Sequence, residues 1–235
     1  MKLIAIDSSG LVASVAIVED DILVGEYNVQ YKKTHSQTLL PMLDALKKMV
    51  DLDLKTVDAI ALSKGPGSFT GLRIGSATAK GLGLAMKVPL VEIPTLDGLA
   101  CNLYGVTDKL ICPIMDARRN QVYTGLYHCR RGLETVMEQC AMDMMDLIRN
   151  LNDMGERAIF LGDGVPVYRE QILQKLKVPC SFAPAANNRQ RAASVASLGA
   201  VYYAHGRTVT AAEHEPEYLR KSQAEREREE QEKAA

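Results

Sequence analysis

A glycine-rich turn at residues 64–75, KGPGSFTGLRIG, holds the residue types in this chain that are best suited to binding chemistry. Its glycines permit a tight turn, and Ser68 or Thr70 can cap a helix that follows it. Backbone N–H groups at a helix start attract anions, and Arg73 would add a positive charge in the first helical turn. We therefore expect Gly67, Ser68 and Arg73 to lie at an anion site or close to a bound nucleotide.

The known nucleotide and hydrolase motifs do not fit this chain. The turn contains no Gly-Lys-Ser/Thr, as a Walker loop requires, and Gly71 falls one position too late for a dinucleotide fingerprint. No Gly-x-Ser-x-Gly elbow is present, so the sequence gives a serine hydrolase no support. The four histidines are scattered without an i, i+4 pair, so we predict no metal site and no catalytic residues.

Two acids follow apolar runs in equivalent places. Asp7 ends the run at residues 3–6, and Asp116 ends the run at residues 110–115. Such acids can bind magnesium or transfer a proton, and they are equally common as plain turn residues at a strand end. The turns after them, DSSG and DARR, lack the glycine pattern of a phosphate-gripping turn.

The elements that position the glycine-rich turn are a strand before it, at residues 58–63, and a helix after it, up to residue 86. That helix carries a small residue every four positions, and each interior glycine costs about 1 kcal/mol relative to alanine. We expect a closely packed helix of another chain to offset this cost, with the chain's own sheet as the alternative. A second helix, at about residues 38–50, is apolar on more than one face. The predicted partner interface therefore combines three leucines with the small residues: Leu39, Leu43, Leu46, Gly71, Gly75, Ala79 and Gly83.

The order of elements repeats along the chain. Three strands at residues 3–29 precede a helix, a strand and a helix, and a similar series begins again at residue 110. Residues 157–164 match residues 58–65 at four of eight positions. We predict an α/β fold of two similar lobes, as in the actin, sugar-kinase and Hsp70 (ASKHA) superfamily. Its parts would be an N-terminal lobe at 1–105, a degenerate C-terminal lobe at 106–220, with a last helix at 194–205 and a closing strand at 213–220, and a charged tail at 221–235.

Composition limits the class of protein. Of the 235 residues, 47% are hydrophobic and 24% charged, which is typical of globular proteins, and the formal charge of −1 creates no global attraction for nucleic acid. Five cysteines without a C-x-x-C pair favour reduced thiols. The first apolar run is too short for a signal peptide, and no run approaches the roughly 20 residues of a membrane span. We expect a cytoplasmic protein that contacts no membrane.

Several of these motifs together resemble the TsaB (YeaZ) family. They are Asp7-Ser8, His35 with Leu39-Leu40-Pro41, the run at residues 64–75, residues 115–119 with Tyr123, and residues 216–220. The resemblance extends from Met1 to about Arg220. The GPGSFTGLR run is its most specific part.

The resemblance implies a non-catalytic subunit in the synthesis of threonylcarbamoyladenosine, next to the anticodon of tRNAs that read ANN codons. It implies a direct heterodimer with the related subunit TsaD, which carries the metal-binding histidines and transfers the threonylcarbamoyl group. It also implies TsaE as an ATPase in the complex, tRNA contact through the complex, and no cofactor of the chain's own, with ATP or ADP near the partner interface.

Four questions stay open from the sequence. The alternatives in function are a glycoprotease-like hydrolase and an independent ASKHA kinase. The free chain can be a monomer or a homodimer through the same helices. Arg118 and Arg119 are expected as exposed arginines, and their contact with tRNA is undecided, as is the role of the tail.

Overall fold

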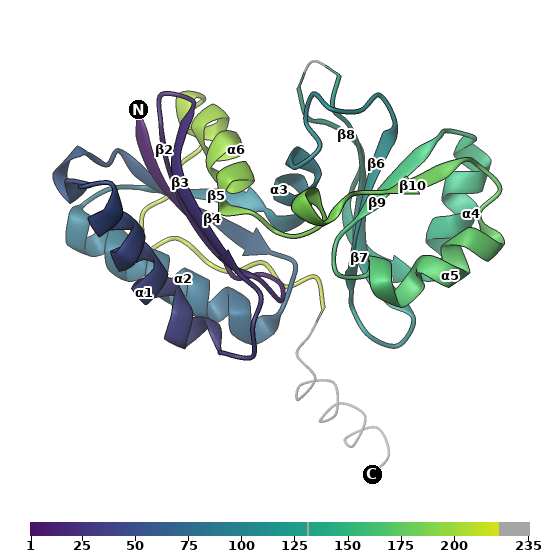
Figure 1. Cartoon of the computed structure of the whole chain (residues 1–235), viewed down its shortest axis with the longest axis horizontal. Helices are drawn as coiled ribbons and strands as arrows, with labels where there is room; N and C mark the ends of the chain where they lie inside the picture. Colours follow the sequence, from purple (N-terminus) through teal and green to yellow (C-terminus); the bar gives the residue numbers. More distant parts are fainter. Residues whose placement is uncertain (131, 221–235) are drawn as a thin grey trace, which may run out of the picture.

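The chain folds into two lobes that each contain a five-stranded sheet, as the computed structural model shows for residues 1–130 and 132–220 (Figure 1). The predicted charged tail at 221–235 lies outside the described residues. The strand order is β3-β2-β1-β4-β5 in the first lobe and β10-β9-β6-β7-β8 in the second. The predicted two-lobed α/β fold is therefore confirmed.

The first sheet is mixed. Its strands are β1 (Lys2–Asp7), β2 (Ala13–Glu19), β3 (Ile22–Val29), β4 (Ala59–Gly65) and β5 (Leu90–Pro94). The first three strands form an antiparallel meander, and β4 and β5 then add in parallel on the other side of β1.

Helices cover both faces of this sheet, and the side chains of β1 point alternately to one face and to the other. Ile4 and Ile6 point to the core under α1 (His35–Met49) and α2 (Phe69–Met86). Leu3 and Ala5 point to the opposite core, under α6 (Ala192–Ala204). This strand is buried on both faces and is accordingly apolar at every position from Leu3 to Ile6.

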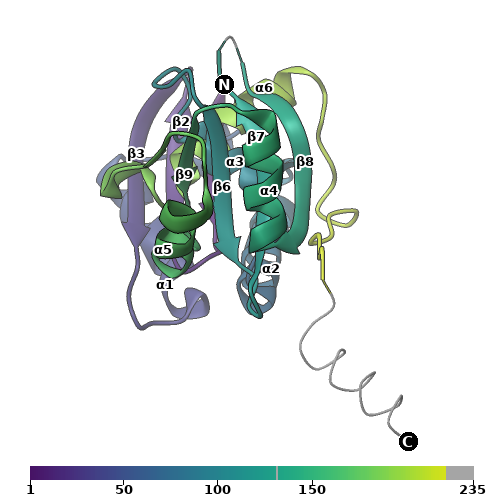
Figure 2. The same cartoon turned by 90° about the vertical axis from the view of Figure 1, so that its right-hand side faces the viewer.

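The second lobe contains β6 (Leu110–Asp116), β7 (Gln121–His128), β8 (Glu134–Asp143), β9 (Ala158–Leu161) and β10 (Cys180–Phe182). Helices α4 (Met144–Met154) and α5 (Val165–Lys175) cover its outer face (Figure 2). On its inner face lies α3 (Thr95–Cys101), whose Leu96 and Leu99 share a core with Ile111 and Tyr127. Two single-turn helices complete the chain, at Leu54–Thr56 and Ala185–Asn187.

The C-terminal part of the chain returns to the first lobe, which differs from the expected boundary. The expected last helix of the second lobe is α6, and its Ala192, Val195 and Ala196 pack on Leu3 and Val91 of the first sheet. After α6, residues 207–220 run along the first lobe beside α2 and end between the lobes (Figure 1). We call residues 207–220 the C-terminal strap.

Two local predictions were wrong, and one helix was not predicted. The predicted closing strand at 213–220 does not form, and the strap makes one isolated bridge instead, between Val209 and Leu90. Pro41 lies inside α1, which begins after Thr34 rather than at Thr38. Helix α5 was missed, because Pro166 near its start reads as a loop signal although proline is well tolerated in a first helical turn.

Within residues 1–130 and 132–220, no helix combines the length and apolar character that crossing a bilayer requires.

Candidate functional site

The turn at residues 64–69 packs against two other segments of the chain. Gly65 has φ of +131°, and a Cβ atom there would lie 2.1 Å from the carbonyl oxygen of Glu217 in the strap. A Cβ atom on Gly67 would lie 2.2 Å from the carbonyl oxygen of Ser9. Neither position can hold a side chain without moving backbone. The two glycines therefore let the turn fit between the strap and the turn that follows β1.

Ser68 caps α2, as predicted. Its Oγ accepts a hydrogen bond from Gly71 N (3.2 Å), and its own N–H donates to Ser9 O (2.7 Å). The chain therefore uses two of the N–H donors that an anion at this helix start would need. Gly67 likewise faces Ser9, so these residues build the turn and do not form an open phosphate cradle.

Arg73 is the charged member of the predicted anion site, and its side chain is exposed. Its guanidinium carbon lies 4.0 Å from the centroid of the Phe69 ring, and Nε donates to Tyr218 Oη (3.3 Å). The Phe69 and Tyr218 rings lie 4.8 Å apart. The guanidinium of Arg73 thus stacks on Phe69 and bonds Tyr218, and these two rings connect α2 to the strap.

The small residues of α2 face their own lobe. A Cβ atom on Gly71 would lie 2.1 Å from Ser8 O, and one on Gly75 would lie 2.3 Å from Ser8 Oγ. Ser8 Oγ also donates to Gly71 O (2.8 Å). Further along, Ala79 is fully buried and Gly83 lies against Leu90 and the strap. The expectation that this stripe meets a helix of another chain is wrong for this structure: the close neighbour is the turn after β1.

The three leucines of α1 are buried as well. Leu39, Leu43 and Leu46 belong to the core between α1 and the first sheet. All seven predicted interface residues are therefore buried inside the lobe. Other residues of α1 and α2 form the sides of these helices that face outward. Among these, Leu40, Met49 and Leu84 are 52%, 70% and 68% exposed, and a Cβ atom on Gly81 would meet nothing within 4 Å.

The two turn acids are held by their own turns. Asp7 is buried and accepts hydrogen bonds from Ser9 N (2.8 Å), Ser9 Oγ (2.7 Å) and Ser63 Oγ (2.6 Å). Burial raises the pKa of the Asp7 carboxyl, although these hydrogen bonds oppose the rise. Asp116 accepts from Arg118 N (2.9 Å) and Tyr168 Oη (3.2 Å). Both geometries are those of strand-end turns.

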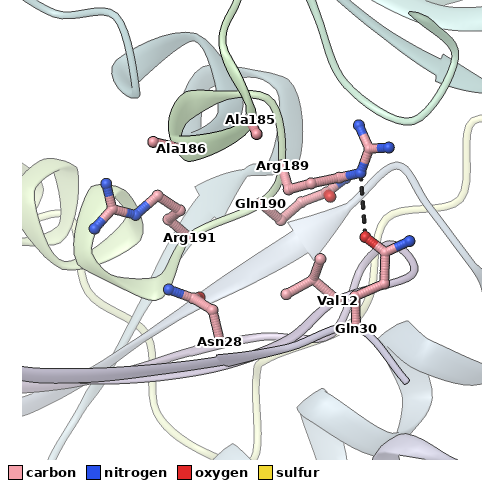
Figure 3. Close-up of a pocket in the computed structure, with 8 residues that line it drawn as sticks. All are labelled: Val12, Asn28, Gln30, Ala185, Ala186, Arg189, Gln190 and Arg191. Carbon is pink, nitrogen blue, oxygen red and sulfur yellow. Dashed lines mark hydrogen bonds between the residues drawn. The ribbon is translucent and has the colours of Figure 1, made fainter. Parts of the chain in front are cut away.

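A cavity of about 390 Å³ lies where the first lobe meets residues 185–191 (Figure 3). Arg189 Nε donates to Gln30 Oε1 (3.3 Å), and Arg191 forms an ion pair with Glu26 (2.5 Å). Gln190 is 1% exposed, and its amide lies against Gly10 with no hydrogen-bond partner among the described residues. The residues that line this cavity form no recognisable motif, so the sequence does not predict it.

The sequence also does not predict a chain of three polar side chains, of which two are buried and Glu92 is half-buried. His214 of the strap is fully buried, and its Nε2 lies 2.8 Å from Ser76 Oγ of α2. Its Nδ1 lies 2.6 Å from Glu92 Oε1 of β5. A hydrogen bond with His214 lowers the pKa of Glu92, against the effect of burial. A histidine 122 residues from its carboxylate partner gives no local sequence signal.

The thiols are poor nucleophiles. Burial raises the pKa of Cys101 and of Cys112 to about 12, and that of Cys129 to about 11. In the part of the chain that the structure describes, no three His, Cys, Asp or Glu side chains gather where they could hold a metal ion.

Comparison with known proteins identifies the family. The family model described as TsaD, tRNA N6-adenosine threonylcarbamoyltransferase, matches residues 28–228. The tRNA threonylcarbamoyladenosine biosynthesis protein TsaB of Bacillus subtilis is 34% identical over 229 residues, which cover 96% of each chain. This chain belongs to the TsaB family.

Solved structures agree with the assignment to the TsaB family. A Pseudomonas aeruginosa protein described as similar to the peptidase YeaZ superposes with a TM-score of 0.79 at 25% identity, covering 93% of this chain and 99% of that one. A polyphosphate/ATP-glucomannokinase from Arthrobacter has a TM-score of 0.50 at 12% identity over 85% of this chain and 98% of its own. The second likeness concerns the fold alone, and it fits the predicted sugar-kinase architecture.

Proposed function

We propose that this TsaB-family chain is a non-catalytic subunit in the biosynthesis of threonylcarbamoyladenosine in tRNA, and that it acts by binding a TsaD-like subunit. In this proposal the partner transfers the threonylcarbamoyl group to the adenosine 3′ of the anticodon in tRNAs reading ANN codons. One observation supports the mode of action most directly: α1 and α2 carry exposed apolar residues on the sides that their own sheet does not cover.

Those outward sides have the character of a helical interface. Leu40 lies near the start of α1, and Leu84 lies near the end of α2. Between them on α2, Ala77 and Gly81 are exposed small residues four positions apart. A partner helix can approach closely over such residues, and large exposed leucines nearby would be buried by it. We therefore place the TsaD-like partner over Leu40, Ala77, Gly81 and Leu84.

The proposal also includes a homodimer of the free chain, the subunit TsaE and a nucleotide. A free chain with this apolar surface can form a homodimer through it, which the heterodimer would replace. TsaE would join the assembled pair as an ATPase, and ATP or ADP would bind near the interface. The chain itself would need no cofactor.

A hydrolase remains the second candidate, because His214 lies between Ser76 and Glu92 in the order of a serine-hydrolase triad. The burial of the side chains opposes this function. Ser76 is 5% exposed and His214 is fully buried, so a substrate could not reach Ser76 Oγ without displacement of the strap. A fluorophosphonate probe tests the alternative directly, since labelling of Ser76 in the folded chain would support a hydrolase.

The experiment for the main proposal is a threonylcarbamoylation assay with unmodified tRNA, TsaD, TsaE and threonylcarbamoyl adenylate, with and without this chain. Gly81→Leu places a large side chain in open space on α2, so it should leave the fold intact and weaken binding to TsaD at least about tenfold. Ser197→Leu is the matched control, because Ser197 is exposed on α6 at the opposite face of the sheet.

The results separate the proposals. Modification that requires this chain, is reduced by Gly81→Leu and is unaffected by Ser197→Leu would support both the function and the interface. Modification without the chain would contradict the function. Full activity of Gly81→Leu would contradict the placement of the partner.

A further inference from the structure

Five side chains from three separate segments meet at one edge of the molecule, where the two lobes adjoin. They come from the start of α2, the turn after β6 and the end of the strap: Phe69, Arg73, Arg118, Tyr218 and Arg220. We call them the junction surface. Hydrogen bonds connect these segments, since Arg73 Nε donates to Tyr218 Oη and Arg220 donates to the carbonyl of Ala117, next to Arg118.

The first half of this surface is a stack of flat groups. Phe69 and Tyr218 pack with their planes tilted by 36°, and the Arg73 guanidinium lies over Phe69. Arg73 is exposed, and Tyr218 is 38% exposed. Aromatic rings and a guanidinium plane are the groups on which proteins stack unpaired nucleotide bases, at about 1–3 kcal/mol per base.

The second half of the surface is positively charged. The Arg118 side chain is 86% exposed and lies 3.7 Å from Asp116. Residues 118–120 all have positive φ, as in a tight turn between β6 and β7. Lys64 neutralises Glu217, at 3.3 Å, so that acid does not oppose the arginines.

We propose that the junction surface contacts RNA, with an unpaired base stacked on Arg73, Phe69 and Tyr218 and with flanking phosphates bound by Arg118 and Arg220. This inference rests on the proposed function, which makes a tRNA anticodon region the substrate of the complex. The chain has a net charge of −1, so a local group of arginines is the feature that would bring RNA to this edge.

RNA fits this surface better than a protein partner does. Protein interfaces concentrate their energy in apolar centres from which water is excluded, whereas Arg118 is almost fully exposed. The exposed apolar residue Leu84 lies at the other end of α2, about 20 Å along the helix axis from Phe69. The junction surface thus lies away from Leu84, and it combines aromatic rings with arginines where the proposed partner face has aliphatic and small residues.

The test uses the full chain and a fluorescein-labelled RNA hairpin with an anticodon loop, measured by fluorescence anisotropy at several salt concentrations. Arg118→Ala should weaken binding about three- to tenfold and reduce the slope of log K against log salt by about 1. Arg73→Ala should weaken binding of the hairpin more than that of a blunt RNA duplex, because stacking requires unpaired bases. Lys48→Ala is the control, because Lys48 is an exposed cation on α1. It should change neither the affinity for the hairpin nor the salt dependence of binding.

Two results would overturn the inference. One is a wild-type chain that does not bind the hairpin, or binds it no better than the Arg118→Ala variant does. The other is that Arg73→Ala and Arg118→Ala retain RNA binding but lose TsaD in a pull-down, which would assign the surface to the protein partner. The anisotropy measurement contains no TsaD, so its failure is distinct from a failure of the threonylcarbamoylation assay.

Discussion

His214 Nε2 lies 2.8 Å from Ser76 Oγ, and this contact fastens the C-terminal strap to the middle of α2. The opposite nitrogen of the same ring contacts Glu92 on β5, at 2.6 Å. One buried side chain thus connects a helix, a strand and a segment without regular structure. The turn at residues 64–69 and the aromatic pair of Phe69 and Tyr218 depend on the strap that His214 holds.

The first prediction concerns this connection. His214→Ala leaves the Ser76 hydroxyl and the Glu92 carboxylate without their buried partner, and should lower the free energy of unfolding by about 2–3 kcal/mol. Urea unfolding followed by circular dichroism measures the change. His205→Ala is the control, because His205 is exposed at the end of α6, and it should stay within about 0.5 kcal/mol of wild type. Equal stability of the two variants would show that the strap does not depend on His214.

The second prediction compares one substitution at two glycines of the same helix. Gly75→Ala places a Cβ atom 2.3 Å from Ser8 Oγ and should destabilise the chain by about 2 kcal/mol. Gly81→Ala meets no neighbour within 4 Å and should stabilise it by about 1 kcal/mol, because alanine favours helix over glycine. Thermal unfolding of both variants gives the sign of each effect. The same sign for both would contradict the orientation of α2.

The third prediction is a pH dependence. The pKa of Glu92 is lowered in the folded chain from its ordinary value of 4.5, chiefly by the hydrogen bond with His214. Its contribution to stability is therefore complete above pH 4.5 and is lost as the pH falls through the folded pKa. Glu92→Gln should destabilise the chain at pH 7, and the difference from wild type should shrink below pH 4.5.

The control for this pH effect is the same substitution in a His214→Ala background. There the main cause of the lowered pKa is gone, so Glu92→Gln should produce a smaller difference with a weaker dependence on pH. Urea unfolding between pH 3.5 and 7 supplies the measurements. A difference that grows toward acid would reverse the expected sign and refute the role of the hydrogen bond.

The sequence predicted those features that local chemistry determines. The repeated order of strands and helices follows from apolar runs and turn residues, and the cap at Ser68 follows from its position before a helical pattern. The small residues of α2 showed that something approaches closely, but a four-residue period does not reveal what it is. The structure shows that the neighbours are Ser8, which is far away in sequence, and Leu90, the first residue of the next strand.

The strap could not be predicted for a related reason. Its residues have no periodicity, and each is fixed by a different distant neighbour: Val209 by Leu90, His214 by Ser76 and Tyr218 by Phe69. The pattern of residues 213–220 therefore suggested a strand that does not exist. Likewise, the sequence does not show which apolar residues of α1 face outward. Leu39, Leu43 and Leu46 were predicted at an interface and lie in the core.

The return of α6 to the first sheet has a consequence during synthesis on the ribosome. Leu3, Ala5 and Val91 belong to one apolar face on which Ala192–Ala204 packs, so the nascent chain carries that face without this helix while the whole second lobe emerges. The second lobe can meanwhile close its own core, since the cluster of Leu110, Phe160 and Ile172 needs no later residue than Phe182. Folding would then finish the second lobe before the first, and the first lobe would be completed only when residues 192–204 have left the ribosome.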